Sequence, residues 1–167
     1  MHNILVTGGA GYIGSHTCKA LAESGFNPIV LDNLSYGHKW AVKWGELIIG
    51  DISNRDLLVK IFRKYKPIAV IHFAAFAYVG ESVKKPDLYY KNNVLGSLTL
   101  LDVMIEQKIP NIIFSSTCAT YGVTKKIPIN ESCPQIPINP YGSSKLMIET
   151  IIKDFSHAFN LNYIILR

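Results

Sequence analysis

The sequence predicts an α/β fold built on a doubly wound parallel sheet, and three observations predict it. Short runs of β-branched and aliphatic residues alternate with longer helical stretches, as in parallel strands joined by crossover helices. The first of these runs leads directly into a glycine-rich turn, residues 8–14, and then into a helical stretch. With 167 residues, 49% of them hydrophobic, the chain is long enough to bury one core, so we expect a single domain over residues 1–167.

The expected strands are short and are separated by glycine, proline or polar residues. They cover residues 3–7, 28–31, 47–49, 69–73, 111–115 and 162–166. A first helix is expected over residues 13–24, and Gly25 suits the position after its end. A strand, a glycine turn, a helix and a second strand are therefore complete by residue 32.

Three further helices are expected along the chain. Ser53 can serve as the N-cap of the second helix, which runs to about residue 64. The third begins near Pro86 and includes residues 89–107, and the fourth follows Pro140. Both of the last two helices carry wide apolar surfaces.

Composition argues against several classes of protein. The net charge of +5 comes from scattered lysine pairs, such as Lys84-Lys85 and Lys125-Lys126, so we expect no nucleic-acid partner. The three cysteines have no C-x-x-C spacing and no paired histidines, which argues against a disulfide framework and against a metal site. The first residues form neither a secretory h-region nor a membrane span, so we expect a cytoplasmic protein without membrane contact.

The glycine-rich turn fits a dinucleotide-binding fingerprint. Gly9, Gly11 and Gly14 have the G-x-G-x-x-G spacing, and Gly8 adds the G-x-x-G-x-x-G form. Such a loop makes a tight turn, brings the backbone close to a pyrophosphate and aims a helix N-terminus at its charge. A glycine turn without a ligand is the alternative, but its place between a strand and a helix favours a Rossmann domain.

Two carboxylates follow the next two expected strands. Asp32 lies 18 positions after Gly14, where a carboxylate can accept hydrogen bonds from ribose hydroxyls and would repel a 2′-phosphate. NAD is therefore preferred over NADP, with an ordinary surface aspartate as the alternative. Asp51 is placed either to meet the adenine edge or to act only as a turn or cap residue.

A second motif, Tyr-x-x-x-Lys, begins the expected fourth helix about 130 residues after the glycine turn. Tyr141 and Lys145 are four residues apart, so they lie on one helix face. The ammonium and a positive nicotinamide ring would both favour the phenolate, so Tyr141 could take a proton from a substrate hydroxyl. We therefore expect an enzyme that oxidises an alcohol. The segment 122–140, with four prolines, should be an irregular loop near this site.

Thr117 follows the expected strand 111–115, at the sheet edge where ligands of open α/β folds bind. Its hydroxyl could hold the substrate oxygen. Taken singly, Thr117, Tyr141 and Lys145 could be a strand-end hydroxyl, a helix-start aromatic and a solvated lysine. The cofactor loop favours the catalytic reading of all three.

These motifs and several further stretches resemble the extended short-chain dehydrogenase/reductase family and, within it, the branch of UDP-glucose 4-epimerases. The resemblance spans nearly the whole chain, and its Val-Gly-Glu-Ser-Val stretch is more specific than the glycine loop. The stretches that carry it are residues 6–17, 31–34, 71–75, 79–83, 89–93 and 140–147.

The resemblance implies a tightly held NAD and the residues that contact it. Those residues are Gly8, Gly11, Tyr12, Ile13 and Gly14 at the pyrophosphate, Asp32, Asn33, Leu34, Ser35, Tyr36 and Gly37 around the adenosine, Asp51 and Ile52 at the adenine, and Phe73, Ala74, Ala75, Phe76, Ala77, Asn92, Tyr141 and Lys145 deeper in.

The resemblance also implies a reaction on UDP-galactose and UDP-glucose. A hydride leaves sugar C4, the 4-ketose rotates, and the hydride returns to the opposite face, which regenerates NAD. Tyr141 would be base and then acid, Lys145 its pKa partner and ribose anchor, and Thr117 a hydroxyl that shuttles or positions the proton. Thr117 and Tyr141 would contact the substrate. A homodimer through the third and fourth helices is implied as well.

The sequence departs from the family pattern in three places. The related 4,6-dehydratases have Thr-Asp-Glu, whereas Cys118 and Ala119 follow Thr117 here, so epimerisation is preferred. Ala77 stands where some epimerases have a lysine that reaches the cofactor. The family continues beyond Arg167, so we expect a chain truncated before the C-terminal substrate domain.

Three other readings stay open. The chain could be a catalytically silent NAD-binding fragment, or an interaction fragment that pairs through its helices. It could also belong to another NAD-dependent nucleotide-sugar epimerase or dehydratase.

Overall fold

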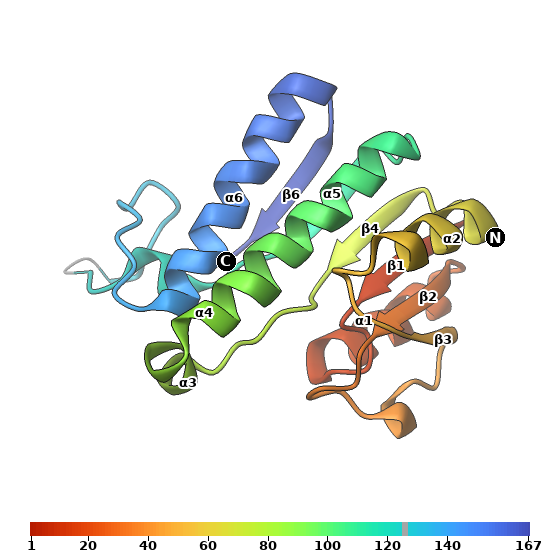
Figure 1. Cartoon of the computed structure of the whole chain (residues 1–167), viewed down its shortest axis with the longest axis horizontal. Helices are drawn as coiled ribbons and strands as arrows, with labels where there is room; N and C mark the ends of the chain where they lie inside the picture. Colours follow the sequence, from red (N-terminus) through yellow and green to blue (C-terminus); the bar gives the residue numbers. More distant parts are fainter. Residues whose placement is uncertain (125–126) are drawn as a thin grey trace.

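The computed structural model describes residues 1–124 and 127–167, and its centre is a six-stranded parallel sheet (Figure 1). The strands are β1 (Asn3–Thr7), β2 (Asn27–Asp32), β3 (Glu46–Ile49), β4 (Ala69–His72), β5 (Asn111–Ser115) and β6 (Asn162–Leu166). Their order across the sheet is β3-β2-β1-β4-β5-β6, and all neighbouring pairs are parallel. The strand order reverses between β1 and β4, which creates a topological switch point. The predicted doubly wound sheet is confirmed.

Helices cover both faces of this sheet (Figure 1). One face carries α1 (Tyr12–Glu23), and the other carries α2 (Arg55–Tyr65), α5 (Gly96–Glu106) and α6 (Pro140–Phe159). The shorter elements are η1 (Lys39–Ala41), α3 (Val79–Lys84), α4 (Pro86–Tyr89), η2 (Tyr90–Leu95) and η3 (Cys118–Tyr121).

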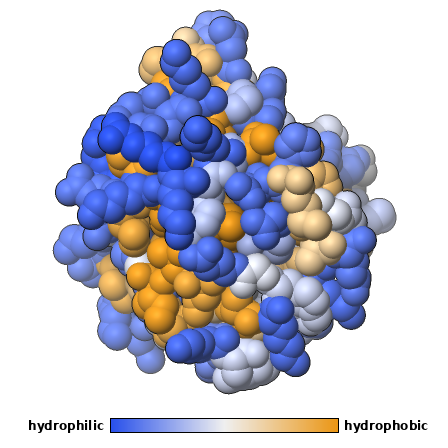
Figure 2. Space-filling model, turned by 90° about the vertical axis from the view of Figure 1, so that its right-hand side faces the viewer, coloured by the Kyte–Doolittle hydropathy of each residue, from blue (hydrophilic) through white to orange (hydrophobic). Residues whose placement is uncertain are grey.

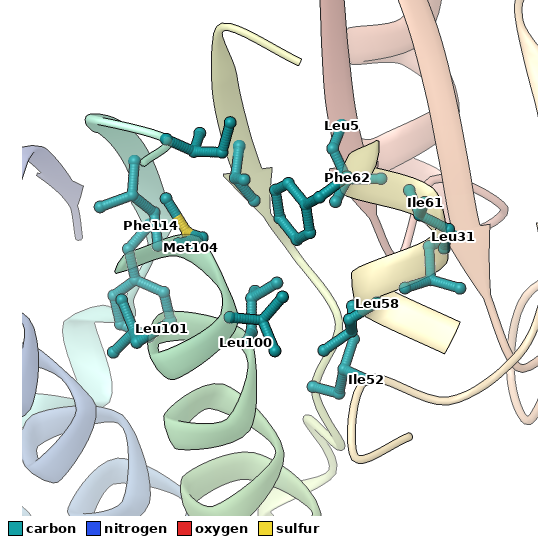
Figure 3. Close-up of a cluster of buried hydrophobic side chains, with 14 of the residues drawn as sticks. Leu5, Leu31, Ile52, Leu58, Ile61, Phe62, Leu100, Leu101, Met104 and Phe114 are labelled. Atoms are coloured by element: carbon teal, nitrogen blue, oxygen red, sulfur yellow. The ribbon is translucent and has the colours of Figure 1, made fainter. Parts of the chain in front are cut away.

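The core is divided by the sheet into two clusters. In the larger cluster, Leu5 and Phe114 of the strands pack with Phe62 of α2 and Leu100 of α5 (Figure 3). The smaller cluster surrounds Cys18 of α1 on the opposite face. Because successive strand residues point to opposite faces, a strand buried on both sides must be apolar at nearly every position. This requirement explains the continuous apolar runs in the sequence.

The main differences from prediction concern the cap of α2, the third helix and α3. The N-cap of α2 is Asn54, whose side chain accepts a hydrogen bond from the Leu57 N–H at 3.0 Å. The predicted cap, Ser53, is wrong because its hydroxyl instead donates to the Asp51 carboxylate at 2.7 Å. The expected third helix is a run of α4, η2 and α5, in which η2 is a π-helical segment. The six-residue helix α3 was not predicted.

The segment 122–140 contains no helix or strand before Pro140 in its described residues, as predicted; Lys125 and Lys126 lie outside them. Apolar side chains remain exposed at both sheet edges, such as Ile49 on β3 and Ile164 on β6. Figure 2 looks onto the β3 side and shows apolar residues gathered in the lower part of that face. In the described part of the chain, no helix is long and apolar enough to cross a membrane.

Candidate active site

A cleft of about 880 Å³ opens at the carboxyl ends of the strands, beside the switch point. Its walls come from the glycine turn after β1, the loop after β2, the segment after β4 and the start of α6. All residues expected to contact the cofactor line this cleft, except Leu34. A cleft of this size at this position is suited to a ligand as large as a dinucleotide.

The glycine turn is too closely packed to hold side chains. Gly8 has φ +73°, and a Cβ there would lie 2.6 Å from the Ala74 nitrogen. A Cβ on Gly14 would lie 2.2 Å from the Gly8 carbonyl oxygen. Gly11 is the N-cap of α1 and provides no side-chain cap, so the first N–H groups of the helix have no acceptor within it. The turn therefore directs donors and the positive end of a helix dipole to the cleft, which suits an anion.

Asp32 joins the glycine turn to the loop after β2. Its Oδ2 accepts a hydrogen bond from the Ala10 N–H at 2.9 Å, and its Oδ1 accepts one from the Leu34 N–H at 2.8 Å. An ionised carboxylate has about four acceptor positions, so two remain for ligand hydroxyls. Leu34 has φ +59°, and its backbone turns toward Asp32.

Asp51 closes a turn and also lines the cleft. Its Oδ1 accepts hydrogen bonds from the N–H and hydroxyl of Ser53, at 2.8 and 2.7 Å, and its Oδ2 accepts one from Asn33 at 2.7 Å. Burial raises the pKa of this carboxyl, but these hydrogen bonds outweigh burial and bring the pKa below its usual value. The turn role is therefore observed, and a contact with adenine stays a prediction.

The start of α6 is fixed by local contacts. Asn139 is its N-cap and accepts a hydrogen bond from the Gly142 N–H at 2.8 Å, and Pro140 begins the helix. A Cβ on Gly142 would lie 2.6 Å from the Ala119 carbonyl oxygen, so glycine allows α6 to approach η3 closely. Tyr141 and Lys145 are thereby both placed in the wall of the cleft.

Lys145 is only 3% exposed, and its ammonium donates to the Ser115 carbonyl at 2.8 Å. Burial lowers the pKa of Lys145 to about 7. Burial raises the pKa of Tyr141, while a hydrogen bond with Thr117 acts in the opposite direction. The pKa of Tyr141 is therefore raised in this structure, chiefly by burial. The stabilisation of the phenolate expected from Lys145 together with a nicotinamide ring stays a prediction.

Thr117 is the N-cap of η3. Its hydroxyl oxygen accepts a hydrogen bond from the Ala119 N–H at 3.1 Å, and its side chain is hydrogen-bonded to the Tyr141 phenol. Tyr141 and Lys145 line the cleft, whereas Thr117 is not among the described residues that do so. Thr117 therefore contacts Tyr141, and Tyr141 and Lys145 share the wall of the cleft.

Several residues of the cleft were not predicted. His38 and Trp40, whose rings stack 5.4 Å apart, line the cleft from the connection between β2 and β3, and Tyr78 lines it from the segment after β4. His38 and Trp40 are aromatic and follow Gly37 closely in the sequence, so they could have been predicted as part of the site. Ser115 accepts the hydrogen bond from Lys145 with its backbone carbonyl. Every residue type has this carbonyl, so the sequence could not single out Ser115.

A buried polar network supports the walls of the cleft. The Nδ1 of His72 lies 2.7 Å from the Thr7 hydroxyl, and burial lowers the pKa of His72 to about 3, so the ring is neutral. Asn93 in η2 bonds both the N–H and the carbonyl of Phe76, at 2.8 and 3.0 Å, and donates to Ser144 of α6 at 3.1 Å. The network fixes the segment after β4 against α6. Within residues 1–124 and 127–167, no three His, Cys, Asp or Glu side chains are grouped as metal ligands.

Comparisons with known proteins agree on one family. Residues 4–167 match the family model described as "NAD dependent epimerase/dehydratase family". The UDP-glucose 4-epimerase of Rhizobium meliloti (strain 1021) is 52% identical over 166 residues, which are 99% of this chain and 51% of that protein.

Two solved structures are closely similar. UDP-glucose 4-epimerase from Brucella ovis, solved in complex with NAD, has a TM-score of 0.98 and 54% identity, over 100% of this chain and 51% of that one. The Thermotoga maritima UDP-glucose 4-epimerase, solved with UDP-glucose, has a TM-score of 0.95 and 39% identity, over 99% of this chain and 54% of that one. The chain therefore spans about half the length of these relatives.

Proposed function

The chain belongs to the NAD dependent epimerase/dehydratase family, and we propose that residues 1–167 form the NAD-binding Rossmann domain of a UDP-glucose 4-epimerase. The reaction is the interconversion of UDP-galactose and UDP-glucose by transient oxidation at sugar C4. One observation carries this proposal: the glycine turn, Asp32 and the Tyr141–Lys145 pair meet in one cleft. The names of the relatives support the substrate, and the NAD complex of the Brucella ovis enzyme supports the cofactor.

The residues of the cleft fit NAD. A Cβ on Gly11 would have only the Gly8 carbonyl oxygen within 4 Å, at 3.4 Å, so this position leaves an open cradle for a pyrophosphate at the N-terminus of α1. Ribose hydroxyls would donate to the free acceptor positions of Asp32, whose charge disfavours the 2′-phosphate of NADP. Asp51 and Ile52 would then bound the adenine.

NAD supplies the hydride acceptor when it is bound, and the chain supplies the proton chemistry. Tyr141 would take the proton of the C4 hydroxyl and later return it from the same phenol oxygen. Because burial raises the Tyr141 pKa, a positive charge must favour the phenolate, and Lys145 can provide it only when protonated. Thr117 is hydrogen-bonded to Tyr141 and would position or pass on the proton.

We propose a homodimer in which α6 and the helical run of residues 86–106 face a second copy. This assembly follows from the family resemblance, and the exposed apolar side chains of Leu95 and Met147 on these helices support it. Sedimentation at several concentrations would test it. The cytoplasmic location expected from the sequence stays a prediction.

Native mass spectrometry of the purified chain, combined with a UDP-galactose conversion assay, tests the function. We expect one NAD per chain, and Tyr141→Phe should keep NAD while losing any conversion of UDP-galactose to UDP-glucose that the chain supports. Bound NAD without conversion would favour the catalytically silent alternative, and conversion only of other nucleotide sugars would favour another member of the family. Loss of NAD in Tyr141→Phe would contradict the role given to this residue.

A further inference from the structure

The rim of the cleft is crossed by a side-chain contact that the proposed function does not use. Tyr36, in the loop after β2, donates from its hydroxyl to the Glu81 carboxylate at 2.9 Å. Glu81 lies in α3, which belongs to the segment after β4, so this bond joins the two walls. Tyr36 and Tyr78 both line the cleft, yet they are 44% and 59% exposed. Residues that face both the cleft and solvent lie at its outer edge.

Ring contacts reinforce the same connection. The Tyr36 ring meets the rings of Phe76 and Tyr78 edge to face, at centroid distances of 5.3 and 5.0 Å. Edge-to-face packing is the arrangement that the charge distribution of aromatic rings favours. Tyr36 therefore contacts three residues of the segment after β4: Phe76, Tyr78 and Glu81.

The Glu81 carboxylate also lies close to Tyr89 and Lys85. The hydroxyl of the fully buried Tyr89 lies 3.1 Å from the same Glu81 oxygen, and the Lys85 ammonium lies 3.5 Å from the other. The Tyr36 hydrogen bond is the main cause that lowers the pKa of Glu81, so this carboxylate is ionised at neutral pH. A fixed, ionised acceptor gives a stronger hydrogen bond than a neutral one would give.

We propose that Tyr36 and Glu81 form a clasp across the cleft that slows the release of a bound dinucleotide. Glu81 is a positioning residue, because it acts by holding the Tyr36 ring over the cleft and not by touching the cofactor. Release requires the hydrogen bond to break and the ring to swing outward. The inference rests on the proposed function, since the dinucleotide is the ligand that the clasp would retain.

The release rate of bound NAD tests the clasp. Preloaded chain is mixed with excess isotopically labelled NAD, and exchange is followed by native mass spectrometry. Tyr36→Phe keeps the ring and removes the donor, and Glu81→Gln keeps the shape and removes the charge. Each should release NAD about threefold to tenfold faster, the effect of one partly exposed hydrogen bond. Tyr163→Phe, an exposed tyrosine on β6 outside the cleft, should release NAD at the unsubstituted rate.

The double variant distinguishes a clasp from two separate effects. If the two side chains act through one bond, Tyr36→Phe combined with Glu81→Gln should be no faster than either single variant. Unchanged release in Tyr36→Phe, or additive effects in the double variant, would overturn the clasp.

Amide hydrogen exchange of the ligand-free chain gives a second readout that needs no cofactor. Both variants should exchange faster across residues 33–37 and normally elsewhere, and unchanged exchange there would also overturn the clasp. An unsubstituted chain that takes up no NAD would overturn the proposed function and the clasp together. Normal uptake with unchanged release would overturn the clasp alone.

Discussion

Burial of Lys145 makes the free energy of unfolding depend on pH, and substituting this one residue should remove that dependence. In the folded chain the pKa of this lysine is about 7, against a usual value of 10.5. Between these values the unfolded chain binds more protons than the folded chain, so the free energy of unfolding rises with pH. Below pH 7 both states are protonated, and the cost of burying the ammonium is fully present.

The size of the effect follows from proton linkage. One pKa unit corresponds to about 1.36 kcal/mol. From pH 7 to pH 9 the folded lysine changes from half to almost fully deprotonated while the unfolded lysine stays charged, so unfolding should cost about 2 kcal/mol more. Lys145→Met removes this titration and keeps an unbranched side chain. Cys18, whose pKa burial raises to about 12, contributes equally to both chains and cancels in the comparison.

Urea unfolding at pH 7, 8 and 9 provides the assay. The unsubstituted chain should gain about 2 kcal/mol relative to Lys145→Met over this range. Lys153→Met, an exposed position on the same helix, serves as the matched control and should follow the unsubstituted chain. A pH profile of Lys145→Met parallel to that of the unsubstituted chain would refute the claim that Lys145 is buried with a lowered pKa.

Three further predictions concern the contacts around the site. Gly14→Ala places a Cβ 2.2 Å from a backbone oxygen of the glycine turn, so it should destabilise the fold by about 1–3 kcal/mol and abolish NAD retention in native mass spectra. Gly80→Ala has nothing within 4 Å of the new atom and should change neither; equal behaviour of the two variants would contradict the packing argument. Asn139→Ala removes the cap of α6 and should cost about 1 kcal/mol in urea unfolding, most of which Asn139→Asp should restore. Glu149, fully buried, accepts hydrogen bonds from Arg167 on both oxygens, so Glu149→Gln should cost about 3–5 kcal/mol. Burial raises the pKa of Glu149, but its hydrogen bonds outweigh burial and bring the pKa below the usual value. The stability that the ion pair contributes should therefore be lost as the pH falls below the usual glutamate pKa. If Glu149→Gln and the unsubstituted chain lost stability equally in acid, this would count against the ion pair.

The sheet was predictable because each strand is marked locally. The strands at residues 3–7, 111–115 and 162–166 agree with prediction at both ends, since each is an apolar run beside polar or turn residues. The N-cap of α2 was less certain for a physical reason. Ser53 and Asn54 are both good caps, and Asp51 decides between them by accepting the Ser53 hydroxyl. That competition involves a residue outside the helix, so a local rule does not reveal it.

The residues of the cleft were predictable as types but their electrostatics were not. Spacing alone places Tyr141 and Lys145 on one helix face, and both line the cleft. The direction of their pKa shifts depends on burial and on the Ser115 carbonyl, which the fold brings to Lys145 from β5. A rule based on the charge of neighbouring side chains leaves out burial, which is the largest cause of the raised pKa of Tyr141.

The clasp illustrates a contact that no local pattern could predict. Tyr36 and Glu81 are separated by 45 positions, and only the meeting of two loops at the switch point brings them together. The proposed reaction gives such a contact a use. An epimerase must keep its cofactor between removal and return of the hydride, because release halfway would leave the sugar oxidised. A domain that only binds NAD has no such requirement. Faster cofactor release in Tyr36→Phe, accompanied by escape of a 4-keto sugar, would therefore link the clasp to epimerisation itself.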